Sequence, residues 1–228
     1  MKPTMFAVFA MFAVLASAAS AFGDDCIVSS YGNYVGTSCG IGDKTFSNFG
    51  YSTEGTNPMP SSSITTNPIN TPFNPGFLFN APWGAEAGQT QGSLLSYTVN
   101  VNQGGNAISD LSLYMFGAAT LGTGQVSVAE SYCAGDTFAD MCAHGTVGEL
   151  LTILNSSTSI LHASASFDPV NIVDVSVNVE LLGGGNNSFA VLSGVQNQFS
   201  EVPEPGSMLL TSTGALGLAG ILRRKLML

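Results

Sequence analysis

The chain has 228 residues and a formal net charge of −10 at pH 7, and only 9% of its residues are charged. Lys44 is the single Lys or Arg between positions 22 and 202, against 14 of the 15 acidic residues, so this segment carries a net charge of −13. A surface without a cationic patch excludes nucleic acid as a partner and disfavours anionic lipid headgroups. It is compatible with sugars, water or divalent cations, and a segment of roughly 180 residues suits one domain.

Residues 1–21 have the features of a signal peptide. Lys2 supplies a short positive region, and Met5–Ala16 is an apolar stretch that is too short to span a membrane. Ala19 and Ala21 then place small residues at the spacing that signal peptidase requires. We expect a signal-peptide helix in residues 1–21, cleavage after Ala21 and export of the remainder.

Residues 22–91 are rich in Pro, Gly and Asn, and we expect them to be irregular. Six prolines lie between positions 58 and 82, a density that argues against helix and against central strands. We therefore interpret Thr53–Trp83 as a long loop packed by its own apolar side chains. Trp83, the only tryptophan, is a candidate glycan contact, with a loop anchor as the alternative. Five tyrosines are further candidates for stacking on sugar rings: Tyr31, Tyr34, Tyr51, Tyr97 and Tyr114.

Residues 92–200 change to strict alternation of apolar and polar side chains. The clearest case is Val173–Leu181, and Leu95–Val101 shows the same period. Period two gives a strand one buried face and one solvated face. Gly183–Asn187 is a turn signal, and Phe189–Phe199 supplies the returning strand. Strands at this spacing, without a helical period, predict an all-β ectodomain folded as an antiparallel, jelly-roll-like β-sandwich.

Four cysteines form two pairs that are local in the sequence. Cys26 lies a short way before Cys39, and Cys133 a short way before Cys142. An even number of cysteines in an exported chain indicates disulfides, for which three connectivities exist. We favour the two local bonds, each worth roughly 2–3 kcal/mol in the chain-entropy model. Zinc binding, the alternative, needs a closer spacing than the chain offers.

No sequence motif predicts catalysis. The chain lacks the nucleophile elbow, the zinc-protease helix, the P-loop, the Rossmann fingerprint and the EF-hand loop, so we predict no catalytic residue, no metal centre and no cofactor. Asp136 and Asp140 lie within the Cys133–Cys142 segment and are candidate calcium ligands, because calcium prefers oxygen donors. A solvated acidic loop is the alternative. We interpret His144 as a loop residue and His162 as a solvent-facing strand residue.

The C-terminal segment, residues 201–228, combines three features. Pro203, Glu204 and Pro205 form a triplet ahead of an uncharged stretch, residues 206–222. This stretch is just long enough to cross a bilayer as a single helix. A basic cluster follows that should stay cytoplasmic and so place the preceding chain outside; it consists of Arg223, Arg224 and Lys225. An ordinary membrane anchor is the alternative to a sorting signal.

This arrangement resembles the PEP-CTERM sorting tail of exported bacterial proteins. The ectodomain is loosely similar to proteins that carry that tail, through the segments Gly124–Glu130, Phe167–Val170, Leu181–Gly184 and Ser193–Asn197. The resemblance implies that an exosortase-type membrane protease processes the chain after signal peptidase has acted. The C-terminal helix would hold the chain in the inner membrane until then, with the ectodomain outside the cytoplasm. The product would reach the cell surface or the extracellular space.

These features together favour an exported, non-enzymatic protein of the cell surface or extracellular matrix. We expect a glycan-binding or adhesive role, with exopolysaccharide as the partner. An extracellular hydrolase that acts on glycans is one alternative, and it needs two convergent carboxylates for which the sequence offers no motif. An ice-binding or surface-binding protein is another, and it needs a regularly spaced array of threonines that the sequence lacks.

Overall fold

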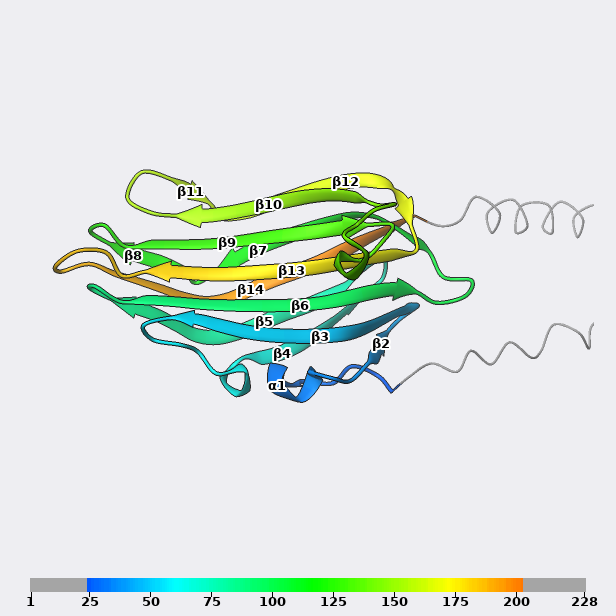
Figure 1. Ribbon diagram of the computed structural model, residues 1–228, viewed down its shortest axis with the longest axis horizontal. Coiled ribbons are helices and arrows are strands. Elements are labelled where there is room, and N and C mark those ends of the chain that lie inside the picture. The colour runs from blue at the N-terminus through cyan, green and yellow to red at the C-terminus, as the bar shows by residue number, and fades with distance from the viewer. Residues whose placement is uncertain (1–23, 203–228) are drawn as a thin grey trace, which may run out of the picture.

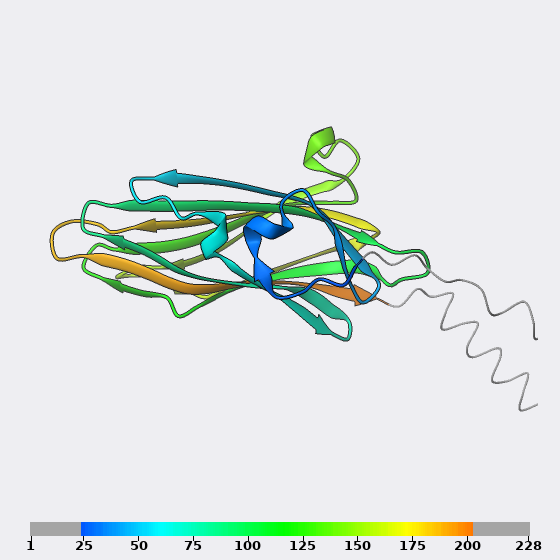
Figure 2. The same ribbon diagram turned by 90° about the horizontal axis from the view of Figure 1, so that it is seen from below.

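The computed structural model describes residues 24–202, which fold into two antiparallel sheets packed face to face (Figures 1 and 2). Each sheet has seven strands. Sheet A contains, in spatial order, β11 (Ser159–Ile160), β10 (Thr146–Leu154), β9 (Gln125–Ala134), β13 (Ile172–Leu182), β6 (Thr90–Val101), β3 (Lys44–Gly55) and β2 (Cys39–Ile41). Sheet B contains β1 (Ser29–Ser30), β4 (Thr65–Thr71), β5 (Asn74–Glu86), β14 (Phe189–Val202), β7 (Ala107–Phe116) and β12 (His162–Val170), and β8 (Ala119–Leu121) also pairs with β14. The helical turns are α1 (Tyr31–Tyr34), η1 (Ser61–Ser63) and η2 (Phe138–Asp140).

The all-β, antiparallel sandwich predicted from the alternation of side chains is confirmed. In β13, every inward residue from Val173 to Leu181 is fully buried, while Glu180 faces solvent. Burial of one branched side chain contributes roughly 1.5–3 kcal/mol. An aromatic cluster fills the space between the sheets, with ring centroids 4.8–6.4 Å apart; it includes Phe46, Phe49, Phe77, Phe79, Tyr97 and Phe199.

The turn predicted at Gly183–Asn187 joins two strands of different sheets. The chain leaves β13 in sheet A and enters β14 in sheet B, so the returning strand does not pair with the strand before it. Alternation shows that both strands have one buried face. Two strands can bury those faces in facing sheets as well as side by side in a hairpin. The connection therefore passes from one sheet to the other at one end of the sandwich.

The interpretation of Thr53–Trp83 as a long loop is wrong, and so is the expectation that residues 22–91 are irregular. Strands β3, β4 and β5 occupy most of that range, and β5 is a central strand between β4 and β14. Its inward side chains alternate as strictly as those of β13, since Phe77, Phe79, Ala81, Trp83 and Ala85 are all buried. The residues on either side of position 91 therefore build one sandwich.

Three of the six prolines lie in strands, and each of these lies where the ladder of hydrogen bonds is incomplete on one side. Pro68 lies in β4 beyond Thr66, the last residue that β1 reaches. Pro75 lies beyond Gly76, where the pairing of β5 with β14 ends. Pro82 lies at the irregularity opposite Leu192–Gly194. Proline has no backbone N–H, and at such positions its absence costs no hydrogen bond. Sheets therefore tolerate proline there.

Both predicted disulfides are confirmed. Cys26 is bonded to Cys39, with 4.9 Å between their Cα atoms, and Cys133 is bonded to Cys142, with 5.8 Å between theirs. The first bond ties the N-terminal segment to β2, and the second closes the loop that carries η2. In Figure 2 this loop projects from the surface of sheet A. Two disulfides and no free cysteine among residues 24–202 indicate an oxidising compartment outside the cytoplasm.

The remaining terminal predictions lie outside the described residues. These are the signal-peptide helix with Ala19 and Ala21, and the tail with its Pro-Glu-Pro triplet and basic cluster. No helix within residues 24–202 is long and apolar enough to cross a membrane.

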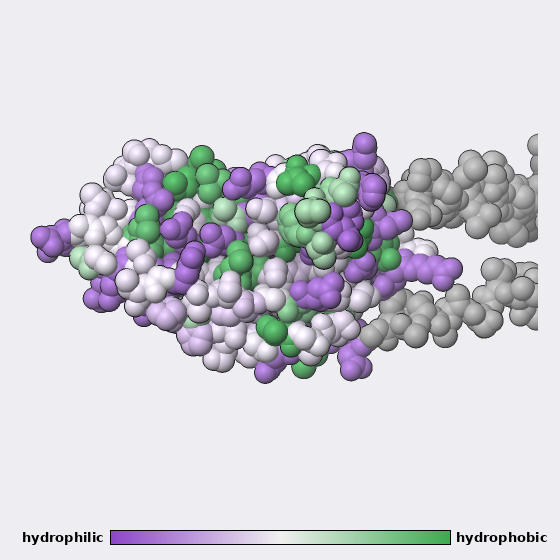
Figure 3. Space-filling view, in the orientation of Figure 1, coloured by the Kyte–Doolittle hydropathy of each residue, from purple (hydrophilic) through white to green (hydrophobic). Residues whose placement is uncertain are grey.

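The outer face of sheet A is of mixed polarity. Figure 3 shows hydrophobic side chains scattered over it, separated by neutral and hydrophilic ones. Leu94, Val147 and Leu151 are among its exposed apolar residues. Isolated apolar side chains of this kind are normal on a soluble surface.

Lys44 lies buried at the end of the sandwich where β14 ends. Its Nζ atom is 2.9 Å from Oε1 of Glu201 and 2.5 Å from Oδ1 of Asp43, and its side chain is fully buried. Asn106 completes the group, because its amide donates to Oε2 of Glu201 and its backbone N–H to Oδ2 of Asp43. The pair with Glu201 joins the first residue of β3 to the end of β14, and loss of Lys44 would leave the buried Glu201 carboxylate without a positive partner.

A second buried polar group links the sheets through the middle of the core. Tyr97 of β6 donates a hydrogen bond to Oδ1 of Asn197 in β14 (2.7 Å), and Asn197 donates to Oε2 of Glu130 in β9 (2.5 Å). All three side chains are fully buried, and Oε1 of Glu130 has no partner among the described residues. Burial raises the pKa of Glu130 from 4.5 to about 8, although the bond from Asn197 opposes the shift. Glu130 is therefore protonated at neutral pH in the folded chain.

The raised pKa of Glu130 predicts that stability falls as pH rises from about 4.5 to about 8. Over this range the unfolded chain loses the proton while the folded chain keeps it, so ionisation favours unfolding. Replacement of Glu130 with Gln, which is neutral and of the same shape, should remove this pH dependence. The variant should be more stable than the wild type at pH 8 by on the order of 4 kcal/mol, since the pKa is raised from 4.5 to about 8 and each pKa unit corresponds to about 1.4 kcal/mol.

Urea unfolding at several pH values, with the disulfides intact, measures this effect. Glu180→Gln on the solvated face of β13 is the matched control and should keep the wild-type slope. The prediction is wrong if the unfolding free energy of Glu130→Gln keeps the same dependence on pH as the wild type.

Candidate functional site

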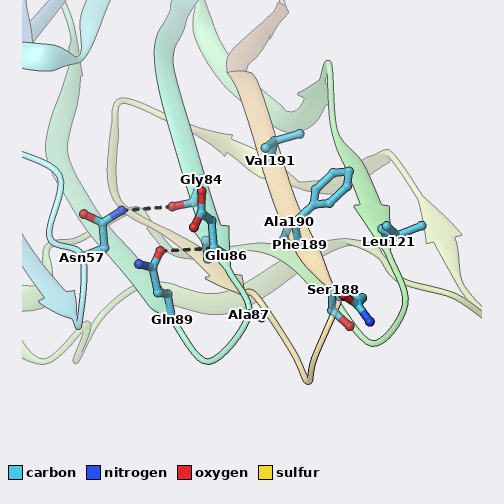
Figure 4. Close-up of a pocket in the computed structure, with 12 residues that line it drawn as sticks. Asn57, Gly84, Glu86, Ala87, Gln89, Leu121, Ser188, Phe189, Ala190 and Val191 are labelled. Carbon is cyan, nitrogen blue, oxygen red and sulfur yellow. Dashed lines mark hydrogen bonds between the residues drawn. The ribbon is translucent and has the colours of Figure 1, made fainter.

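A groove of about 890 Å³ lies on the outer face of sheet B (Figure 4). It lies where β5, β14 and β8 run side by side. Their register places Glu86, Phe189 and Leu121 in one row across the three strands. Gly84, Val191 and Ala119 form the next row. Side chains two residues apart share a face of a strand, so both rows point outward from the sheet.

The groove has one apolar wall. Leu121 is 53% exposed, and Phe189 and Val191 are each 38% exposed. Figure 4 shows these three side chains together on one side of the groove. Three large apolar side chains that remain accessible in adjacent strands offer a continuous nonpolar contact.

The opposite wall is polar, as Figure 4 shows for Asn57, Glu86 and Gln89. The Asn57 side-chain amide donates to the carbonyl of Gly84 (3.3 Å), which leaves its own oxygen free of protein partners among the described residues. Oε1 of Gln89 accepts from the Glu86 N–H (3.1 Å), and the Gln89 amino group has no protein partner among the described residues. This wall therefore offers an acceptor, a donor and the Glu86 carboxylate.

A buried amide holds the polar wall in place. Gln91 is only 3% exposed; its Oε1 accepts from the Gly84 N–H (2.8 Å) and its Nε2 donates to the carbonyl of Asn57 (2.7 Å). It thereby clamps the segment that follows β3 against β5. Gly84 keeps the floor of the groove low because it has no side chain. A Cβ built at Gly84 would have only Val191 within 4 Å, at 3.8 Å, so a larger residue at this position would occupy the groove. The walls are thus fixed and the floor is open.

A second hollow, of about 670 Å³, lies on sheet A beneath the loop closed by the Cys133–Cys142 disulfide. Asp174 is its one carboxylate. Oδ1 of Asp174 accepts from the Thr98 hydroxyl (2.9 Å), and Oδ2 accepts from the backbone N–H of Phe138 (2.9 Å). Oδ2 thus fastens the loop to the sheet and Oδ1 joins β13 to β6, so both oxygens of this carboxylate already have protein partners.

Trp83 is a core residue, and the prediction of a glycan contact there is wrong. The side chain points inward from β5 and is 1% exposed, and its Nε1 donates to Oγ of Ser93 (3.2 Å). Of the tyrosines considered, Tyr31, Tyr34 and Tyr97 are also buried, whereas Tyr114 lies on the outer face of sheet B.

Asp136 and Asp140 stabilise their own loop. Asp136 accepts from the backbone N–H of His144 (3.0 Å), and this bond, with a weaker one from Thr137, lowers the pKa of its carboxyl group. Asp140 accepts from the Thr137 hydroxyl (3.3 Å). Calcium requires six to eight oxygen ligands, and within residues 24–202 no three His, Cys, Asp or Glu side chains gather to hold a metal. The structure supports the solvated acidic loop.

The sequence alone does not predict the groove residues. Asn57 and Gln89 lie in connections, and Glu86, Phe189 and Leu121 lie in strands that are distant in the sequence. Only the pairing of β5 with β14 and of β14 with β8 brings them together. The available signal is the outward position of large apolar residues in Phe189–Val191, where alternation calls for polar ones.

Comparisons with known proteins add little. No family model and no curated protein matches the chain. One similar solved structure is TmCBM61 in complex with β-1,4-galactotriose, with 9% identity and a TM-score of 0.28 over 66% of this chain and 88% of that one. Another is the enzymatically active domain of tailspike protein 4 from bacteriophage CBA120, with 11% identity and a TM-score of 0.27 over 66% of this chain and 19% of that one. Likeness at this level carries no argument about function, so the argument rests on the groove.

The burial of Trp83 predicts the behaviour of the only tryptophan fluorophore. Its emission should be blue-shifted in the native chain and weakly quenched by acrylamide, because the indole is inaccessible to water and solute. Unfolding in urea should shift the emission to the red and restore the quenching seen for free N-acetyltryptophanamide. Strong quenching of the native chain would contradict the inward position of Trp83.

Proposed function

We propose that the chain is an exported, non-enzymatic protein of the cell surface or extracellular matrix that binds glycan in the groove between Glu86 and Leu121. The observation that carries the proposal is the pairing of an apolar wall with a polar wall. A sugar ring presents C–H groups on its faces and hydroxyls on its edges. The Phe189 ring is suited to the first, and the free groups of Asn57 and Gln89 are suited to the second.

The charge distribution supports an uncharged or positively charged glycan as the ligand. Lys44 is the only Lys or Arg within residues 24–202, and its side chain is buried. The surface of this part of the chain therefore offers no Lys or Arg to a uronate or a sulfate. The groove itself contains the Glu86 carboxylate, which repels anions.

The lining of the groove supports binding over cleavage. Glycoside hydrolysis usually uses two carboxyl groups on opposite sides of the scissile bond. Glu86 is the one carboxylate among the residues that line the groove. A single acidic group can accept hydrogen bonds from sugar hydroxyls without the partner that the reaction needs.

The route of export is part of the same proposal. The two disulfides support an oxidising destination. We infer that signal peptidase removes residues 1–21 and that the PEP-CTERM-like tail directs the chain to an exosortase-type protease. Exopolysaccharide would then be the natural glycan partner at the cell surface.

Affinity electrophoresis in native gels tests glycan binding. The full chain, kept soluble in a non-ionic detergent, should be retarded in gels that contain at least one neutral polysaccharide from a panel of dextran, laminarin and galactomannan. Alginate, which is anionic, should not retard it. Phe189→Ala should weaken binding roughly tenfold, because loss of a central aromatic contact costs more than about 1 kcal/mol.

Two further variants sharpen this test. Gly84→Val should abolish retardation by filling the floor, and its backbone suits a β-branched residue in a strand. Leu151→Ala removes a comparably exposed side chain from the outer face of sheet A and should bind as the wild type does. Wild-type retardation of both Phe189→Ala and Gly84→Val would rule out the groove as the binding site.

The sorting proposal predicts the mass of the chain recovered from its native cell envelope. Processing should leave a product that starts at Phe22 and ends near Pro203–Gly206, alone or with an added group. Intact-mass spectrometry measures this directly. A product that runs to Leu228 would make the tail a permanent anchor and would remove the exosortase step from the proposal.

A further inference from the structure

An exposed row of aromatic rings lies on the same face of sheet B as the groove. Tyr114 and His162 are cross-strand partners in β7 and β12, and their rings stack with centroids 4.1 Å apart and planes 21° apart. Phe116, two residues further along β7, lies nearly parallel to Tyr114 at 6.1 Å and is 43% exposed. We call Phe116, Tyr114 and His162 the aromatic row.

The aromatic row is bordered by neutral polar side chains. Gln196 of β14 is the cross-strand partner of Tyr114, and Gln198 is the partner of Ser112. Gln198 donates to the carbonyl of Asn74 (3.1 Å), and the Ser200 hydroxyl donates to Oδ1 of Asn74 (2.8 Å). Aromatic rings beside amides and hydroxyls repeat the chemistry of the groove, where an apolar wall faces an amide wall.

Strand β14 connects the aromatic row to the groove. Phe189 lies in the groove, and Gln196 lies beside the aromatic row further along the same strand. At about 3.3 Å per residue Gln196 is roughly 23 Å from Phe189, and Gly194, the cross-strand partner of Phe116, is roughly 17 Å from it. Val191 and Ser193 point outward between them; Val191 belongs to the apolar wall of the groove, and Ser193 is a small polar residue.

We propose that the outer face of sheet B is one extended track for a linear, uncharged polysaccharide, held by the groove at one place and by the aromatic row at another. This inference rests on the proposed function, because it takes the groove as a glycan site. It adds a second binding region and a substrate class, a polymer long enough to reach both regions.

Charge and shape both favour this occupant. The face that carries the aromatic row offers no Lys or Arg, since the one such residue among those described is Lys44, buried at the end of the sandwich. Asp110 and Glu86 lie on the same face, so anionic polymers are repelled along its length. A protein partner of ordinary interface chemistry would need a wider apolar patch than three rings bordered by amides. A polysaccharide chain can lie over β14 together with the neighbouring strands β7 and β12, which carry the aromatic row.

Two contact regions on one chain predict a dependence on ligand length. Once the groove holds one part of a polysaccharide, the aromatic row meets the rest at a high effective concentration. A trisaccharide centred on Phe189 falls short of the aromatic row, whose nearest member, Phe116, is the partner of Gly194, five residues further along β14. Loss of the aromatic row should therefore weaken binding of the polymer and leave binding of the fragment unchanged.

The experiment uses the full chain and whichever neutral polysaccharide of the panel retards it most, together with trisaccharides released from that polymer. His162→Ala and Phe116→Ala should each raise the Kd for the polysaccharide roughly five- to tenfold, as expected for loss of an exposed aromatic contact, with the Kd for the trisaccharide unchanged. His162→Phe keeps a ring and should bind the polymer as the wild type does. Phe189→Ala should weaken both ligands, and Leu151→Ala neither.

The outcomes separate the two proposals. If His162→Ala and Phe116→Ala both bind the polysaccharide with the wild-type Kd, the track is overturned while the groove stands. If no neutral polysaccharide retards the wild type, the proposed function fails and the track fails with it. Thermal unfolding of each variant shows whether a lost affinity reflects a lost fold, and the retained ring of His162→Phe shows whether aromatic contact or the histidine itself matters.

Discussion

The buried amide of Asn197 holds the two sheets in a fixed relation, and the rest of the molecule depends on that contact. It accepts from Tyr97 and donates to Glu130, which belong to two different strands of the opposite sheet. A shift of β14 by one residue would turn Asn197 outward and bring Gln196 or Gln198 into the core without partners. It would also turn Phe189 and Val191 inward and destroy the groove. One hydrogen-bonded side chain thus fixes both the interior of the sandwich and the face that we propose binds glycan.

The only Lys or Arg side chain of the described residues is used for structure. Lys44 is buried between Asp43 and Glu201 and closes the end of the sandwich where β14 finishes. Desolvation makes such a group a weak source of stability, but its geometry joins β3 to β14. Its burial also leaves the described surface without an accessible Lys or Arg to offset its acidic residues. Lys44 therefore helps to close the sandwich, and its burial disfavours anionic ligands on the described surface.

Much of the fold can be predicted from the sequence, because a buried face leaves a period of two. Val173–Leu181 and Leu95–Val101 are identified in this way, and both disulfides follow from spacing and compartment. Strand β5 carries an equally clear period, from Phe77 to Ala85, but its prolines suggest a loop. Proline density argues against strands only if every N–H is needed, and here Pro75 and Pro82 lie at gaps in the ladder of hydrogen bonds. The same error places Trp83 on the surface.

The candidate site cannot be predicted in the same way, because it depends on which strands are neighbours. Phe189 lies beside Glu86 and Leu121, although both are far from it in the sequence. Alternation tells which face a side chain occupies, but it does not tell which strand comes next to it, and here a turn even carries the chain from one sheet to the other. In the groove itself, the outward Phe189 and Val191 are the signal in the sequence that this face has a role beyond contact with water.

The direction of β14 gives the two proposals a common geometry. The strand begins in the groove at Phe189, passes the aromatic row at Gln196 and ends at Val202, directly before the Pro-Glu-Pro triplet. At about 3.3 Å per residue, the extended strand separates the groove from the end nearest the tail by roughly 43 Å. A chain attached through the new C-terminus that processing would leave would therefore present the groove at the far end from the attachment and the aromatic row nearer to it. A polysaccharide bound along the track would run in the direction of that strand, which is an arrangement suited to a matrix component fixed at one end and joined to a polymer along its length.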